Sequence, residues 1–109
     1  LRLGEAHCNS RGLVHGGLIA AIADNAMGLS CGAALASEGH AAPGGLVTVT
    51  LSTDYLGTAR LGQWFATHTH FVKTGRSLCF ADCLVQADGR PIARANATFK
   101  VLGKVPGSD

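Results

Sequence analysis

One helix-forming stretch, residues 17–35, restricts the fold of this chain of 109 residues more than any other feature. Its apolar side chains recur at steps of three to four residues, and its many alanines permit close packing on both sides. Everything after residue 45 reads as strand. Burying one such helix requires a sheet that wraps around it, so we expect an α+β fold with a long central helix.

We expect about five antiparallel strands. Alternating β-branched and apolar residues predict them at 1–6, 46–55, 63–73, 77–87 and 91–102. Glycine-containing hairpin turns at 74–76 and 88–90 join the last three strands, and a loop at 38–45 ends the helix. In the strand 46–55, simple alternation predicts one face made of Leu46, Thr48, Thr50 and Ser52.

The length and the 47% hydrophobic content fit one compact domain, expected over residues 1–103, with a flexible tail at 104–109. The first residue is Leu1, already within a strand-like alternation. We therefore expect the N-terminus to be truncated and some N-terminal structure to precede Leu1.

Composition also argues against several classes of function. The basic residues behind the net charge of +2 are scattered, which argues against nucleic acid but leaves room for an anionic small ligand. The helical stretch contains Asp24, Asn25 and glycines, and no signal peptide is evident, so no membrane association is expected. The four cysteines form no CxxC pair and match no zinc signature, which predicts no metal and reduced thiols in the cytoplasm.

His15, Gly16 and Gly17 open the helix. The first backbone N–H groups of a helix have no intrahelical partner and attract an anion or a polarised carbonyl. Glycines leave those groups accessible, because no Cβ blocks a ligand. The simpler interpretation is a tight turn with no further role.

Asp24 is the one acid within this apolar helix. An acid there either faces solvent or works in a site. It follows Gly16 by eight residues, about 12 Å along a helix axis, which is too far for both to act on one carbon. If they share a site, Asp24 must come from the other subunit of a two-fold dimer.

The span from Glu5 to Lys100 resembles the hotdog-fold acyl-CoA thioesterases, specifically the small tetrameric type of the phenylacetate pathway. The resemblance rests on several short features in a fixed order. These are Asn9 six residues before His15-Gly16-Gly17, Asp24 seven residues after Gly17, Ala42-Pro43-Gly44, the Thr-rich strand through Tyr55, Ala59-Arg60-Leu61-Gly62, and Lys73-Thr74-Gly75-Arg76-Ser77-Leu78.

The resemblance implies a five- to six-stranded antiparallel sheet around the helix and an active site shared by two subunits. The Gly16 N–H would polarise the thioester carbonyl, and Asn9 would position the carbonyl or water. Asp24 of the other subunit would be the nucleophile or the general base. Thr48 would steady the attacking water, and His15 would orient the turn or contact the thioester.

Residues beside coenzyme A are implied as well. Gly17, Lys73, Gly75 and Arg76 would bind the substrate, the two basic groups meeting its phosphates, with solvated turn charges as the alternative. Coenzyme A is part of the substrate, so no separate cofactor is expected. The expected assembly is a homodimer, further paired into a dimer of dimers.

The aromatic side chains are expected in the core, although one could line an acyl pocket; they are Trp64, Phe65, Phe71, Phe80 and Phe99.

Two other functions fit the same fold. A non-catalytic module that binds acyl thioesters would keep the glycine turn but lack a competent acid, and Asp24 argues against it. A dehydratase of hydroxyacyl thioesters would need a His and an acid placed to move protons at carbons 2 and 3. His15, at the opening of a glycine turn, does not provide that arrangement.

Overall fold

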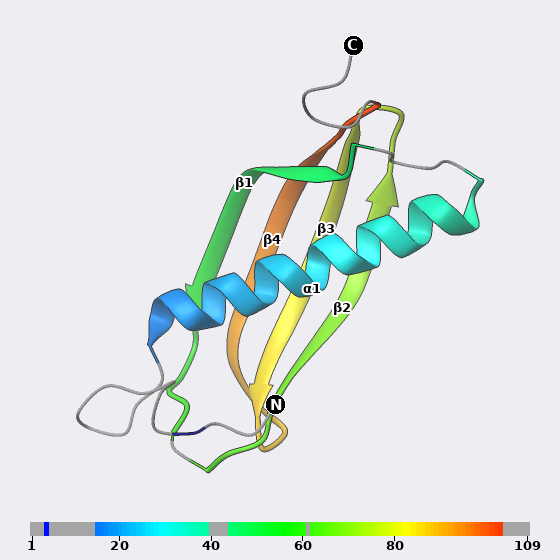
Figure 1. Ribbon diagram of the computed structural model, residues 1–109. Helices are drawn as coiled ribbons and strands as arrows, with labels where there is room; N and C mark the ends of the chain where they lie inside the picture. Colours follow the sequence, from blue (N-terminus) through cyan, green and yellow to red (C-terminus); the bar gives the residue numbers. More distant parts are fainter. Residues whose placement is uncertain (1–3, 5–14, 40–43, 61, 104–109) are drawn as a thin grey trace.

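One helix lies across one face of a curved antiparallel sheet (Figure 1). The computed structural model describes Gly4 and residues 15–39, 44–60 and 62–103. Its elements are α1 (Gly16–Ser37), β1 (Leu46–Tyr55), β2 (Phe65–Thr74), β3 (Leu78–Ala87) and β4 (Arg90–Val101). The sheet order is β1-β4-β3-β2, so β1 and β2 form its two edges.

The helix and the last four strands agree with the sequence prediction to within two residues at each end. The number of strands differs, because the described residues form four strands and not five or six. The additional strand expected at residues 1–6 lies outside the described residues except for Gly4, which is not in a strand.

The buried face of α1 repeats every four residues and packs on small side chains of the sheet. Met27 and Cys31 lie at its centre and have no exposed surface. The strands opposite contribute mostly alanine and cysteine, so the helix can approach the sheet closely. The buried helix positions are Ile19, Ala23, Met27, Cys31 and Leu35.

By length and composition alone, α1 could also cross a membrane, since it has 22 residues and a mean hydropathy of 1.5. The sequence prediction treated its polar residues and glycines as interruptions and missed this. The core helix of a globular domain meets the same criterion, and α1 packs on the sheet through its buried face.

A β-bulge interrupts the alternation of β1. Thr48 pairs with Phe99 and Thr50 with the adjacent Thr98, so Val49 is an extra residue. Thr48 therefore lies on the helix side, whereas Thr50 lies opposite Thr98 on the other side. The prediction that Thr48 and Thr50 share one face is wrong for this reason.

The aromatic side chains divide between the two faces of the sheet. Phe65 and Phe99 are buried, as expected. Trp64, Phe71 and Phe80 are 53%, 48% and 39% exposed, so their assignment to the core is wrong for the single chain. Phe71 and Phe80 alternate with residues that face α1, and the described residues place no second layer on their side of the sheet.

Candidate functional site

Asp24 and Thr48 meet between the middle of α1 and the start of β1. The Thr48 hydroxyl donates a hydrogen bond of 2.8 Å to Oδ1 of Asp24. The bulge at Val49 lies directly beside Thr48. Asp24 is half-buried, and Oδ2 accepts no hydrogen bond from the described residues. One carboxylate oxygen is thus held in place, while the other is available to a ligand or to water.

The first turn of α1 presents two open donors. His15 precedes the helix in an extended conformation, and its carbonyl accepts from the N–H groups of Leu18 and Ile19 at 3.1 and 3.3 Å. Its side chain makes no capping hydrogen bond. Among the described residues, the N–H groups of Gly16 and Gly17 have no partner. With no acidic side chain in this turn, its partial positive charge is available to an anion.

Tyr55 holds this turn from the end of β1. Its hydroxyl donates a hydrogen bond of 2.7 Å to the Gly16 carbonyl. A Cβ on Gly16 would lie 3.3 Å from the Tyr55 ring, so glycine permits this close approach. Sequence reasoning missed Tyr55. The contact joins residues 39 positions apart, and no local pattern indicates such a pairing.

A groove of about 520 Å³ runs between α1 and the start of β1. Asp24 and Thr48 lie at one end of it, and Ala33 and Gly45 at the other. Nine residues of helix separate Asp24 from Ala33, which corresponds to about 14 Å. Its lining also includes Gly28, Gly32, Leu46 and Phe99. Most of the side chains along the groove are therefore apolar, and its polar side chains, Asp24, Asn25 and Thr48, lie at one end.

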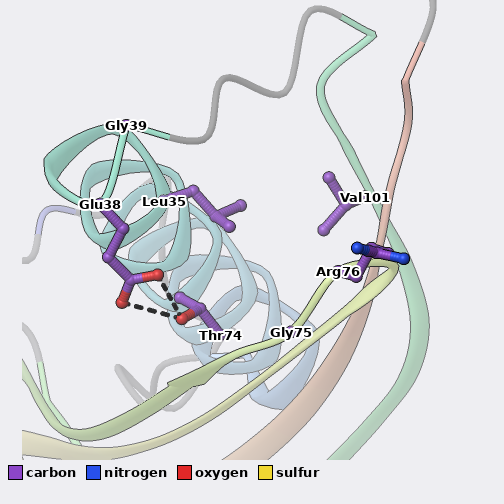
Figure 2. Close-up of a pocket in the computed structure, with 7 residues that line it drawn as sticks. All are labelled: Leu35, Glu38, Gly39, Thr74, Gly75, Arg76 and Val101. Atoms are coloured by element: carbon purple, nitrogen blue, oxygen red, sulfur yellow. Dashed lines mark hydrogen bonds between the residues drawn. The ribbon is translucent and has the colours of Figure 1, made fainter.

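A second cavity, of about 590 Å³, lies at the C-terminal end of α1 beside the β2–β3 turn (Figure 2). Thr74 donates to both carboxylate oxygens of Glu38, at 2.9 and 2.7 Å. Gly75 and Arg76 line the cavity, with Arg76 on the opposite side from Glu38. Arg76 forms no ion pair with any described residue.

The β2–β3 turn places its two basic residues on different faces. Thr74 contacts α1, so Lys73 points to the other face of the sheet, where it pairs with the exposed Phe80. Position 75 has room only for glycine, because a Cβ there would lie 2.7 Å from the Leu78 carbonyl oxygen. Of the predicted substrate-binding residues in this turn, the structure thus groups Gly75 with Arg76 and separates Lys73 from them.

The structure does not bring all the predicted site residues together within one chain. Gly16 and Asp24 occupy the same helix eight residues apart, about 12 Å along its axis. Gly16 lies beside the end of β1 and Asp24 beside its start. Asn9 lies outside the described residues. One chain therefore supplies an open helix start and an oriented carboxylate at separate places.

Cysteine and metal chemistry find little support in the described part of the chain. Cys31, Cys79 and Cys83 are buried and unpaired by disulfides. Burial, with smaller contributions from Cys79, raises the pKa of Cys31 to about 11. Burial and the Asp82 charge also raise the pKa of Cys83. Neither thiol is activated, and no three His, Cys, Asp or Glu residues of the described chain are grouped to hold a metal ion.

Known proteins resemble this chain over most of its length. The sequence profile of the thioesterase superfamily matches residues 11–93. Human acyl-coenzyme A thioesterase 13 is 36% identical over 105 residues, which cover 94% of this chain and 70% of the human protein. A Pseudomonas aeruginosa protein, described only provisionally as an esterase, is 38% identical over 99 residues, covering 91% and 70% of the two chains.

Solved structures share the fold. A Bacillus halodurans protein with coenzyme A superimposes with a TM-score of 0.79 at 27% identity, covering 94% of this chain and 64% of that one. Mouse thioesterase superfamily member 2 gives a TM-score of 0.73 at 28% identity, covering 93% and 71%.

Proposed function

This chain belongs to the thioesterase superfamily, and from that membership we propose that it hydrolyses a short-chain, medium-chain or aryl acyl-CoA in a site shared by two subunits. It is a thioester hydrolase with the hotdog fold. The observation that carries the proposed site is the hydrogen bond from Thr48 to Asp24 at one end of a groove lined mainly by apolar side chains.

The proposed chemistry needs few groups because a thioester carbonyl is only weakly stabilised by resonance. The Asp24 carboxylate attacks the carbonyl carbon or removes a proton from the attacking water. The Thr48 hydroxyl orients the carboxylate through its hydrogen bond to Oδ1, so that Oδ2 stays available for the carbonyl carbon or for the attacking water. The Gly16 N–H of the partner subunit stabilises the negative charge that develops on the carbonyl oxygen. The thiolate of coenzyme A leaves and takes up a proton given up by the water. If Asp24 attacks directly, water then hydrolyses the anhydride formed between the acyl group and Asp24, which releases the free acid and restores the carboxylate.

The proposed dimer forms through β1. This strand is an edge of the sheet, and its exposed side chains include Val47, Val49 and Leu51. Pairing β1 with its copy, antiparallel about a two-fold axis near Leu51, would place Thr48 of one subunit opposite Tyr55 of the other. Thr48 contacts Asp24, and Tyr55 contacts Gly16. The pairing would therefore bring the carboxylate of one subunit to the helix start of the other.

We assign the acyl group to the groove that begins at Asp24. Gly28 and Gly32 keep its helix side open, and Leu46 and Phe99 supply apolar surface. A length of about 14 Å would accommodate an aryl or medium acyl chain. Because a Cβ on Gly32 would meet no atom within 4 Å, a larger side chain there can enter the groove without displacing its neighbours.

Replacing Gly32 by leucine should shorten the acyl chain that the enzyme accepts. We expect Gly32→Leu to lower kcat/KM for aryl and medium-chain substrates by about 10- to 100-fold, since its side chain would occupy their volume. Hydrolysis of acetyl-CoA should stay within about twofold of the parent. Gly32→Ala is the control, because it makes a similar change in helix propensity with little added volume. Equal losses on all chain lengths would contradict the assignment of the groove.

The phosphates of coenzyme A are assigned to the cavity beside the β2–β3 turn. Arg76 lines it and has no ion-pair partner among the described residues. Its guanidinium group can bind a phosphate through two parallel hydrogen bonds. Lys73 lies on the other face of the sheet. Within one subunit it would therefore contribute to the electrostatic field around the protein but would not line this cavity.

The test of the proposed function is a hydrolysis screen over aliphatic and aryl acyl-CoAs, followed by the release of free thiol. We expect saturable turnover of at least one class, and a dimer or a larger even assembly in sedimentation. Tight binding of coenzyme A without turnover of any substrate would instead indicate the non-catalytic binding module. A monomer that is fully active would contradict the shared site.

A further inference from the structure

We propose that Tyr55 is a positioning residue for the reaction. It holds the peptide group between Gly16 and Gly17 so that the Gly17 N–H is directed to the thioester oxygen as a second donor beside the Gly16 N–H. The inference rests on the proposed function and adds to it a residue from outside the helix. Its basis is the hydrogen bond of 2.7 Å from the Tyr55 hydroxyl to the Gly16 carbonyl.

The two open donors of the helix start belong to two successive peptide groups. The Gly16 N–H shares a planar group with the His15 carbonyl, which accepts from Leu18 and Ile19 at 3.1 and 3.3 Å. The Gly17 N–H shares a planar group with the Gly16 carbonyl, which accepts from Tyr55. In a trans peptide the carbonyl and the N–H point in opposite directions. Fixing each carbonyl therefore fixes the direction of the N–H on its other side.

The Tyr55 bond also acts on the strength of the donor. A hydrogen bond donated to a peptide carbonyl polarises that peptide and makes its own N–H a better donor. The effect reaches the Gly17 N–H, which has no partner among the described residues. Preorganised donors of this kind stabilise charge that appears only in the transition state. Tyr55 should consequently affect kcat more than substrate binding.

The close packing of the Tyr55 ring on the first turn of α1 supports a specific role for its phenol group. A Cβ on Gly16 would lie 3.3 Å from both the ring and the hydroxyl oxygen of Tyr55, so the ring lies directly on the first turn. The side chain is nevertheless 52% exposed and is not part of the buried core. Removing its hydroxyl should therefore change the orientation of the turn without unfolding the domain.

The first test is Tyr55→Phe, which keeps the ring. We expect kcat to fall about tenfold, with KM within about twofold and an unchanged affinity for free coenzyme A. The control is Ser37→Ala, which removes a similar hydroxyl-to-carbonyl bond, of 2.8 Å to Ala34, at the other end of α1. We expect that variant to keep the parent kcat and KM.

The second test uses the fact that Tyr55 is the single tyrosine of the chain. Growth with fluorinated tyrosines would therefore change the acidity of this phenol alone. At a pH at which every phenol stays protonated, kcat should rise stepwise with phenol acidity while KM stays constant. A purely structural tyrosine would show no such trend.

The outcomes separate this inference from the proposed function. If the parent hydrolyses acyl-CoA but kcat is unchanged in Tyr55→Phe and in the fluorinated chains, the inference is wrong and the proposed function stands. If kcat and KM change together and no acidity trend is found, Tyr55 is structural and the inference is likewise wrong. If the parent hydrolyses no acyl-CoA, both are wrong.

Discussion

Asp24→Asn should lower acyl-CoA hydrolysis by about 10³-fold or more while the protein stays folded. The amide has nearly the shape of the carboxylate and can still accept the Thr48 hydrogen bond of 2.8 Å. It cannot remove a proton from water or attack a carbonyl as an anion. The loss should therefore appear in kcat, which is measured by the release of free thiol. The affinity for coenzyme A, measured by calorimetry, should change little.

A matched control is Asp88→Asn. Asp88 lies in the β3–β4 turn, where its Oδ1 accepts a hydrogen bond of 2.8 Å from the Trp64 N–H, and the amide oxygen of asparagine can accept the same bond. We expect its activity to equal that of the parent. An Asp24→Asn protein as active as the parent over the whole substrate panel would reject the mechanism.

The fold could be predicted from the sequence because its signals are local. Apolar residues at helical spacing marked α1, and β-branched alternation with glycine turns marked all four described strands. The faces of the strands were harder to predict. The bulge at Val49 and the exposure of Phe71 and Phe80 depend on strand pairing and on which face the helix covers. Both are tertiary properties that alternation alone does not contain.

The candidate site residues that the sequence itself could indicate are those with unusual local chemistry. Asp24 was evident as the acid of an apolar helix, and Gly16 as part of a glycine pair at its start. Thr48 came from the family resemblance, since a threonine in a Thr-rich strand has no distinguishing pattern of its own. Tyr55 was missed because its contact with Gly16 is formed only in the folded chain.

Gly16→Pro should lower kcat by about 10²- to 10³-fold, because proline removes the N–H proposed to stabilise the oxyanion. Proline is favoured at the first position of a helix. The preceding His15 already has the extended conformation, with φ −62° and ψ 133°, that a following proline requires. Gly16→Ala is the control, since it adds the same Cβ, 3.3 Å from the Tyr55 ring, but keeps the N–H. Similar losses in both variants would assign the effect to crowding.

Mixing the two inactive variants should restore activity if each site takes Asp24 from one subunit and Gly16 from the other. In a dimer of Asp24→Asn with Gly16→Pro, one site carries both changes and the other carries neither. Random exchange makes about half of the dimers mixed, so about a quarter of the parental activity should return. A site built within one chain would give no recovery, because every site would then carry one of the two changes. The ratio of recovered to parental kcat, measured after subunit exchange, therefore decides directly whether the carboxylate and the helix start act across the interface.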